Sequence, residues 1–180
     1  NGATPNFPSS KKPMLAPTPV SVVDAKGNLL PEVLPILDMV AEHDVVLSSG
    51  HLNITEIWPL FEEAQRRGVK RLICNHPTYI VDATLQDITK LANMGVYIEH
   101  SMCMFAENSK FRMFDPVNLK SIIDAAGVDK TILGSDLGQE GNPRLVDGFL
   151  SVIEICLDLG YTEAEVRKMV SSNAAALVGI

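Results

Sequence analysis

Apolar residues in this chain gather in short runs that recur along the second half and most of the first. Four runs end at a titratable residue: "DVVLSSGH" at His51, "KRLICNH" at His76, "GVYIEH" at His100 and "KTILGSD" at Asp136. Short apolar runs bounded by polar loops are typical of strands buried on both faces. The pattern therefore predicts four buried strands.

Segments with helical spacing of apolar residues alternate with these strands. Asn53 and Glu56 form a possible capping box, Asp115 is a predicted N-cap with Pro116 at the first helical position, and Gly127 is a predicted stop. The predicted helices fall within residues 31–43, 53–68, 84–95, 115–127, 142–160 and 162–179. Strands that alternate with helices indicate an α/β fold with a parallel sheet.

Four βα units fit two architectures. A doubly wound sheet accepts four strands, whereas a (β/α)₈ barrel needs eight and typically about 250 residues. We expect the C-terminal half of such a TIM barrel, strands 5–8 with their helices, in residues 29–180. Residues 1–28, with five prolines before residue 20 and a possible hairpin turn at 26–28, are expected to form an irregular arm after strand 4. A half-barrel would expose apolar surface, so the missing N-terminal half, strands 1–4, is the expected partner.

Composition narrows the classes of function. The 180 residues carry a formal net charge of −7 with a pI of about 5.0, which argues against a nucleic-acid-binding surface. The sequence has no apolar stretch of the roughly 18 residues that a membrane span needs. Three scattered cysteines, at 74, 103 and 156, fit free thiols in a reducing compartment, and we expect a cytoplasmic protein that forms a homo-oligomer.

The polar residues at the strand ends are the candidate chemistry. In parallel α/β folds the βα loops converge at the carboxyl edge of the sheet, where sites are built. His51, His76 and Asp136 offer imidazoles and a carboxylate, which suit Zn²⁺ best, with Mn²⁺ or Fe²⁺ as alternatives. A bound metal lowers the pKa of water toward about 7. Asp136 beside that water would accept its proton and return it to a leaving group.

Simpler interpretations exist for each residue. A lone strand-end histidine is more often structural, and Asp136 alone is more often a helix cap or turn residue, with a salt bridge as a further alternative. Four such residues in series favour a shared site. Glu99 and His100 point to opposite faces of their strand, so either could contact substrate or a residue that holds the metal. Gln139 and Asn142 could contact substrate or only bond within their loop. The further expectations are that Asn75 points away from the site and that Cys74 is buried.

The strand ends also resemble a known family. "SSGHLN", "LICNHP", "VYIEHSM" and "TILGSDLGQ", with the terminal "EVRKMVSSNAAALVGI", resemble the C-terminal half of the amidohydrolase superfamily of metal-dependent hydrolases, over about residues 29–180. Within it, the run looks most like an uncharacterised group of predicted amidohydrolase-like proteins. The resemblance implies a (β/α)₈ barrel with His51 and His76 on strands 5 and 6 as metal ligands and Asp136 on strand 8 as ligand or proton carrier. The chain departs from the family in having no HxH pair and no assignable strand-4 ligand.

These patterns predict a metal-dependent hydrolase that activates water for attack on an amide, lactone or ester bond of a small molecule. A metal-dependent decarboxylase or hydratase on the same scaffold is a close variant. A non-enzymatic α/β ligand-binding module is the competing class. A third alternative is that the half-barrel is inactive without its other half.

Overall fold

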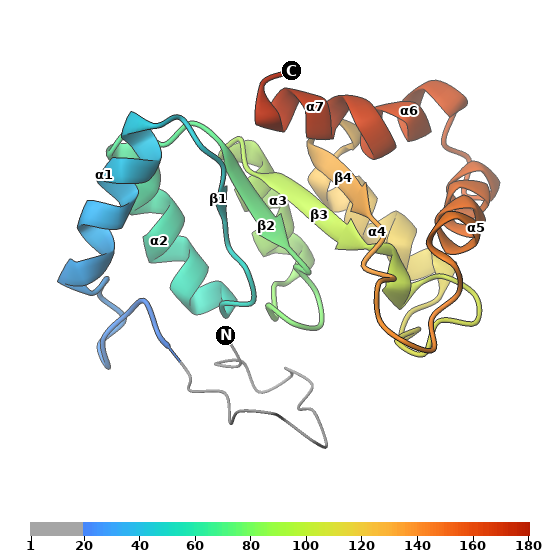
Figure 1. The fold of residues 1–180 in the computed structure, drawn as a ribbon, viewed down its shortest axis with the longest axis horizontal. Coiled ribbons are helices and arrows are strands. Elements are labelled where there is room, and N and C mark those ends of the chain that lie inside the picture. The colour runs from blue at the N-terminus through green and yellow to red at the C-terminus, as the bar shows by residue number, and fades with distance from the viewer. Residues whose placement is uncertain (1–19) are drawn as a thin grey trace.

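A parallel four-stranded sheet forms the centre of the molecule (Figure 1). The computed structural model describes residues 20–180. The strands follow one another across the sheet in chain order, and each neighbouring pair is parallel. Their bounds are Leu47–Ser48 (β1), Leu72–Asn75 (β2), Tyr97–Ser101 (β3) and Thr131–Gly134 (β4). The predicted α/β class and parallel sheet are confirmed.

A helix follows each strand, close to where the sequence pattern places it. The capping box between Asn53 and Glu56 is formed, the Asp115–Pro116 start is used, and Gly127 ends its helix with φ of 78°. The helices are Leu34–Glu42 (α1), Ile54–Arg66 (α2), Leu85–Asn93 (α3), Pro116–Ala126 (α4), Leu145–Asp158 (α5), Glu163–Arg167 (α6) and Asn173–Val178 (α7). A 3₁₀ turn at Pro31–Val33 precedes α1, and a π-helical turn at Lys168–Ser172 joins α6 to α7.

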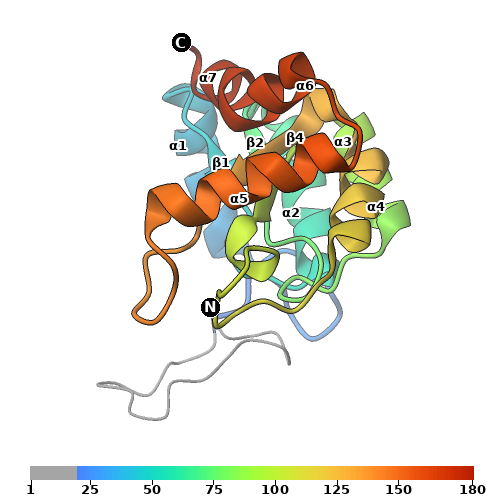
Figure 2. The ribbon, with the colours of Figure 1, turned by 90° about the vertical axis from the view of Figure 1, so that its right-hand side faces the viewer.

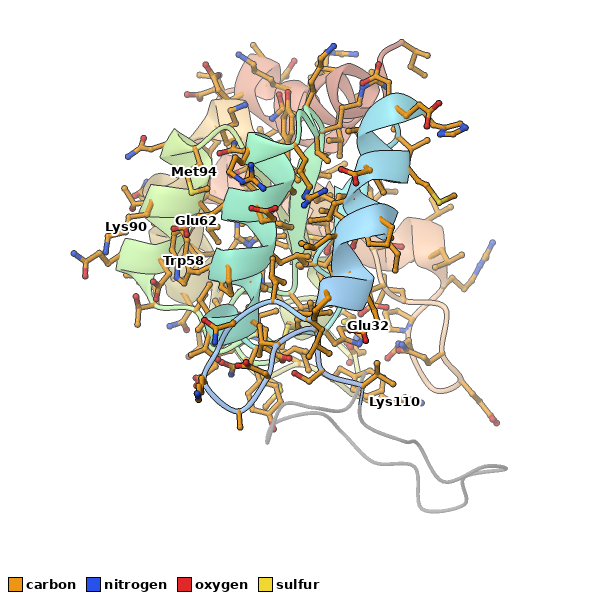
Figure 3. The ribbon with its side chains drawn as sticks, turned by 90° about the vertical axis from the view of Figure 1, so that its left-hand side faces the viewer. Glu32, Trp58, Glu62, Lys90, Met94 and Lys110 are labelled. Carbon is orange, nitrogen blue, oxygen red and sulfur yellow. The ribbon has the colours of Figure 1, made fainter. Side chains whose placement is uncertain are left out.

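The first four helices form one layer. Side-chain bonds join each helix to the next, and Figure 3 shows α1, α2 and α3 side by side. The bonds are Arg67 to Asp38 at 2.5 Å, Trp58 Nε1 to Asp87 at 3.3 Å, and Thr89 Oγ1 to the Ala125 carbonyl at 2.9 Å.

The two faces of the sheet differ in character. Side chains alternate along a strand, and strand neighbours in register share a face. One face is buried except at Leu47 and consists of Leu47, Leu72, Cys74, Ile98, His100, Thr131 and Leu133. The other face is mixed in character and ranges from buried to exposed. It carries the polar or small residues Ser48, Asn75, Glu99, Ser101 and Gly134 together with Ile73, Tyr97 and Ile132.

The C-terminal helices close the end of the sheet where the strands begin. The Asn173 amide donates to the carbonyl of Val128, in the 3₁₀ turn before β4, at 2.7 Å and to that of Thr131, at the start of β4, at 2.6 Å. Arg71 donates to the carbonyl of Val178 at 2.8 Å. Figures 1 and 2 place α5 beside β4, the edge strand. The carboxyl ends of the strands therefore lie at the opposite end from α6 and α7.

The expected N-terminal arm is only partly within the described residues. Residues 1–19 lie outside them. The hairpin turn is present, because Val23 and Leu29 form an antiparallel bridge and Asp24 N donates to the Asn28 carbonyl at 2.8 Å. Within residues 20–180, every helix is too short or too polar to traverse a bilayer.

Candidate functional site

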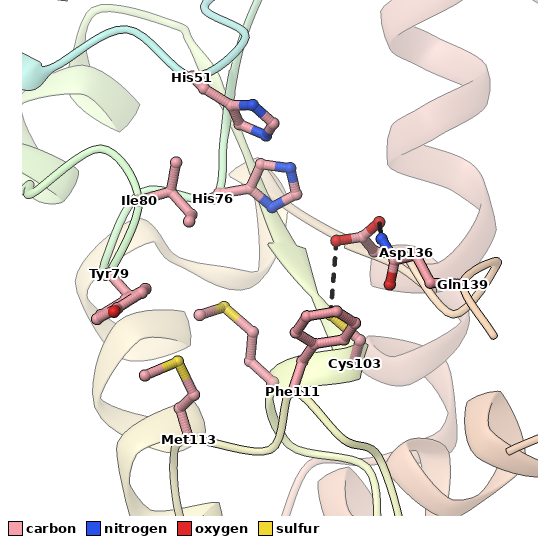
Figure 4. Close-up of a pocket in the computed structure, with 10 residues that line it drawn as sticks. His51, His76, Tyr79, Ile80, Cys103, Phe111, Met113, Asp136 and Gln139 are labelled. Atoms are coloured by element: carbon pink, nitrogen blue, oxygen red, sulfur yellow. Dashed lines mark hydrogen bonds between the residues drawn. The ribbon is translucent and has the colours of Figure 1, made fainter. Parts of the chain in front are cut away.

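A cavity of about 360 Å³ opens at the carboxyl ends of the strands (Figure 4). Four of the predicted site residues, His51, His76, Asp136 and Gln139, line it. The remaining lining residues are Tyr79, Ile80, Cys103, Met104, Phe111 and Met113. The structure thus brings together side chains that follow β1, β2 and β4.

The two histidines form one pair. Their ring centroids are 4.8 Å apart, with the planes tilted by 37°. Burial lowers the pKa of both imidazoles, and the charge of His76 lowers that of His51 further, against an opposing effect of Asp136. The neutral imidazole is therefore favoured at neutral pH, and this is the form that ligates metals.

His76 and Asp136 both have left-handed backbone conformations, with φ of 48° and 45°. Residues other than glycine adopt this region rarely, although His, Asn and Asp do so more often than most. Such conformations persist only where the surrounding structure enforces them, and they gather at functional sites. His76 directly follows Asn75, the last residue of β2, and its side chain lines the cavity.

Asn75 does not line the cavity that His76 enters. Its amide Nδ2 donates to Glu99 Oε2 at 3.2 Å, and its Oδ1 accepts from Ser48 Oγ at 2.5 Å. Asn75 therefore contacts the neighbours of His76 and not the cavity itself.

Glu99 is buried and lies beside His76, on the face of the sheet opposite His100. Its carboxylate is 4.0 Å from His76 Nδ1, and Ser101 Oγ lies between them, in a short contact with Nδ1. Burial raises the pKa of Glu99 and Asp136 raises it further, while the bonds from Asn75 and Ser101 lower it.

His100 lies on the opposite face of β3. Its side chain is 1% exposed and does not line the cavity. Burial lowers its pKa to about 3. Within the described residues neither of its ring nitrogens has a hydrogen-bond partner. Of the two neighbours, the structure therefore brings Glu99 and not His100 toward His76.

Asp136 has no role as a helix cap. The next helix, α5, begins only at Leu145, and none of the ion pairs within residues 20–180 involves Asp136. Its Oδ2 accepts from Cys103 Sγ at 3.5 Å, and its Oδ1 accepts from Gln139 Nε2 at 3.5 Å (Figure 4). Burial, aided by Asp136, raises the pKa of Cys103 to about 12, so this thiol stays protonated as a donor.

Asn142 holds two loops together. Its Oδ1 accepts from Ser109 Oγ and from the Lys110 backbone, both at 3.3 Å, and its Nδ2 donates to Gln139 Oε1 at 3.2 Å. It does not line the cavity, and its bonds stay within the loops.

The apolar wall of the cavity was not predicted from the sequence. Five side chains form it, from the loop after β2 and the segment between β3 and α4: Tyr79, Ile80, Met104, Phe111 and Met113. The available signal was the density of aromatic and Met residues in "MCMFAENSKFRMF", a segment between a strand and a helix where loops are usually polar.

The donor set suits a metal by its chemistry. Two imidazoles and a carboxylate around one cavity are ligands that Zn²⁺ accepts. Among residues 20–180 as they stand, no group of three or more His, Cys, Asp or Glu side chains is arranged to hold a metal ion. Metal binding at His51 and His76 therefore stays a prediction.

Three comparisons place the chain among known proteins. A solved structure from Pseudomonas putida, named provisionally as a 2-pyrone-4,6-dicarboxylic acid hydrolase, matches with a TM-score of 0.56 and 16% identity. The match covers 83% of this chain but 59% of that one, so this chain spans about three fifths of its length, and the likeness shows the fold alone. None of the curated proteins matches this chain. Residues 3–99, just over half of the chain, match the model of a family of unknown function. The chain therefore belongs to that family, DUF6282.

Proposed function

We propose that this chain is the C-terminal half of a metal-dependent hydrolase of the amidohydrolase type. The observation that carries the proposal is the pairing of His51 and His76, from adjacent strand ends, at a cavity that Asp136 also lines. The fold that the chain shares with part of a protein named as a hydrolase supports it.

His51 and His76 would hold the metal, with Asp136 as a third ligand or as its neighbour. When bound, a divalent metal supplies a polarised carbonyl and water of lowered pKa. Asp136 is the proton acceptor for the attacking water and then the donor to the leaving group. Its carboxylate is held for this by Cys103 and Gln139, each a donor to one of its two oxygens.

The cavity suggests the kind of substrate. Its polar end is formed by the two histidines, Asp136 and Gln139, and its other wall is apolar. Among the described side chains that line it, none is Lys or Arg. A substrate carboxylate is typically bound by such a cation. An amide, lactone or ester with an uncharged apolar group therefore fits the part of the cavity that these residues line.

The open face of the sheet supports the half-barrel. In a complete (β/α)₈ barrel, helices cover the outside and the inner face is filled by side chains from all eight strands. The helix layer α1–α4 and the opposite face of β1–β4, where Ile73, Tyr97 and Ile132 lie among polar residues, correspond to those two surfaces. The remaining strands of the barrel are the partner that this face requires.

Metal content and hydrolysis test the proposal together. Purified full-length protein, supplied with Zn²⁺ or Mn²⁺ and then dialysed, should retain about one or two ions per chain by elemental analysis. It should then hydrolyse members of a panel of phenyl esters, aryl amides and lactones. His51→Ala and His76→Ala should lower metal content at least about 10-fold, whereas His43→Ala, at an exposed site on the end of α1, should not.

The outcome of the metal assay separates the competing classes. If the parent protein, with its histidines intact, retains neither Zn²⁺ nor Mn²⁺, the hydrolase proposal is contradicted. A ligand-binding module is then favoured. A protein that holds metal and leaves the whole panel intact would favour the decarboxylase or hydratase variant.

A further inference from the structure

We propose that Glu99, acting through the Ser101 hydroxyl, positions His76 in the tautomer that carries its proton on Nδ1. Ser101 Oγ contacts His76 Nδ1 directly and lies 3.4 and 3.5 Å from the two carboxylate oxygens of Glu99. Glu99 and Ser101 are two residues apart on β3, so their side chains share one face of the sheet. The three residues form a continuous chain of contacts that ends at the cavity.

The donor and acceptor in each of these hydrogen bonds follow from the number of hydrogens available. A serine hydroxyl donates one hydrogen and accepts through its lone pairs. Ser101 can donate either to His76 Nδ1 or to the Glu99 carboxylate, and a charged acceptor makes the stronger bond. Ser101 therefore donates to Glu99, and its oxygen accepts from the Nδ1 hydrogen of His76.

Asn75 holds the Glu99 carboxylate, which is the acceptor at the end of this series of contacts. Its Oδ1 accepts from Ser48 Oγ at 2.5 Å, which turns its Nδ2 toward Glu99 Oε2 at 3.2 Å. An ionised carboxylate only accepts, so the amide faces Glu99 with its Nδ2 donor and Ser48 with its Oδ1 acceptor. Both Glu99 and Ser101 are buried, at 9% and 2% exposure, so water competes little for these bonds.

The consequence is the state of the other ring nitrogen. A neutral imidazole protonated on Nδ1 has an unprotonated Nε2, and His76 lines the cavity. Hydrogen bonds to one ring nitrogen are what select the tautomer and raise the basicity of metal-ligating histidines. The tautomer itself does not depend on the proposed function; only the use of Nε2 as a metal ligand rests on it.

Nitrogen NMR of the metal-free full-length protein tests the tautomer directly. The chain has four histidines, and His76→Gln identifies the His76 signals by their loss. At about pH 8, above the ordinary imidazole pKa, the chemical shifts distinguish a protonated ring nitrogen from an unprotonated one. The expected spectrum shows Nδ1 protonated and Nε2 unprotonated. A predominant Nε2–H form would overturn the proposal.

Variants test which residues impose this state. Ser101→Ala and Glu99→Gln should each shift the tautomer ratio of His76 toward Nε2–H by about 10-fold, the size expected when a hydrogen bond to a charged group is lost. Ser101→Thr, which keeps the hydroxyl, should restore the parent ratio. Glu56→Gln is the matched control, because Glu56 is an equally buried glutamate in the capping box of α2. An unchanged ratio in both Ser101→Ala and Glu99→Gln would also overturn the proposal.

Zinc titration separates this proposal from the proposed function. Both variants should weaken Zn²⁺ binding by about 10–100-fold, as loss of a residue that orients a ligand does, and Glu56→Gln should not. If the parent binds no zinc but shows the Nδ1–H tautomer and its loss in the variants, the metal site fails and the positioning role stands. If zinc binding depends on His76 but the tautomer ratio does not change in Ser101→Ala and Glu99→Gln, the positioning role of Glu99 is contradicted and the metal site is not.

Discussion

Gly134 on β4 leaves the space that the Glu99 carboxylate on β3 occupies. A Cβ atom at position 134 would collide with Glu99 Oε1. Ser101 pairs with Gly134 in the register of the two strands, so the missing side chain lies directly beside the chain of contacts that reaches His76. The glycine in "ILGSD" thus leaves room for the Glu99 carboxylate in its present position.

Gly134→Ala should therefore destabilise the protein by about 1–3 kcal/mol, since overpacking displaces a buried side chain. Urea denaturation measures this, and the Zn²⁺ affinity should fall as well if Glu99 moves. Gly138→Ala is the control: a Cβ there meets no atom within 4 Å. Equal stability of the two variants would show that Glu99 has another position available to it.

Asp136→Asn should abolish proton transfer while keeping the backbone, because Asn tolerates the left-handed conformation as Asp does. With an ester or lactone that the parent protein hydrolyses, kcat should fall by about 10²- to 10⁴-fold. Circular dichroism should show an unchanged fold. Asp129→Asn, at an exposed ion pair with Lys168, is the control and should retain activity. Retention of activity in Asp136→Asn would remove Asp136 from the proposed mechanism.

His100→Leu should raise the unfolding free energy at neutral pH by about 1 kcal/mol. The substitution removes two buried ring nitrogens that have no partner among residues 20–180, and such groups are costly to bury. Thermal unfolding measures the change, and His43→Gln, at an exposed site, should leave the melting temperature unchanged. A lower melting temperature in His100→Leu would mean that the imidazole has a stabilising role.

The lowered pKa of His100 should also make the stability of the protein depend on pH. The pKa of His100 is about 3 when folded and about 6.5 when unfolded. Between these values the unfolded chain binds the extra proton, so stability rises with pH and is lost as pH falls below about 6.5. The contribution approaches about 1.4 kcal/mol per pH unit within that window. His100→Leu should flatten the slope of the unfolding free energy between pH 4 and 6 by about that amount.

Asn173→Ala should destabilise the protein by about 1–3 kcal/mol, because two carbonyls, one just before β4 and one at its start, lose their donor. Asn173→Asp should cost more, since a carboxylate cannot donate to either carbonyl. Ser172→Ala, at the exposed neighbouring position, is the control in the same denaturation experiment. The Asn in "SSNAAAL" would be dispensable only if water replaced its amide.

Much of the fold could be predicted from local chemistry. The apolar runs located all four strands, and Asn53 with Glu56, Asp115 and Gly127 marked helix ends through bonds that need only neighbouring residues. The placement of His51, His76 and Asp136 at one edge also followed from sequence, because parallel strands share the direction in which they end. Their roles in binding a metal and moving protons stay predictions.

Contacts between strands decided the rest. Strand alternation puts Glu99 and His100 on opposite faces, but only the packing of the helix layer shows that His100 is enclosed and Glu99 faces His76. The left-handed conformation of His76 could not be predicted from the sequence. The sequence by itself determined the order of elements and the strand ends, since these depend on periodicity and capping. The tertiary structure alone decided which polar side chains meet, because those contacts join residues about 25 positions apart on different strands.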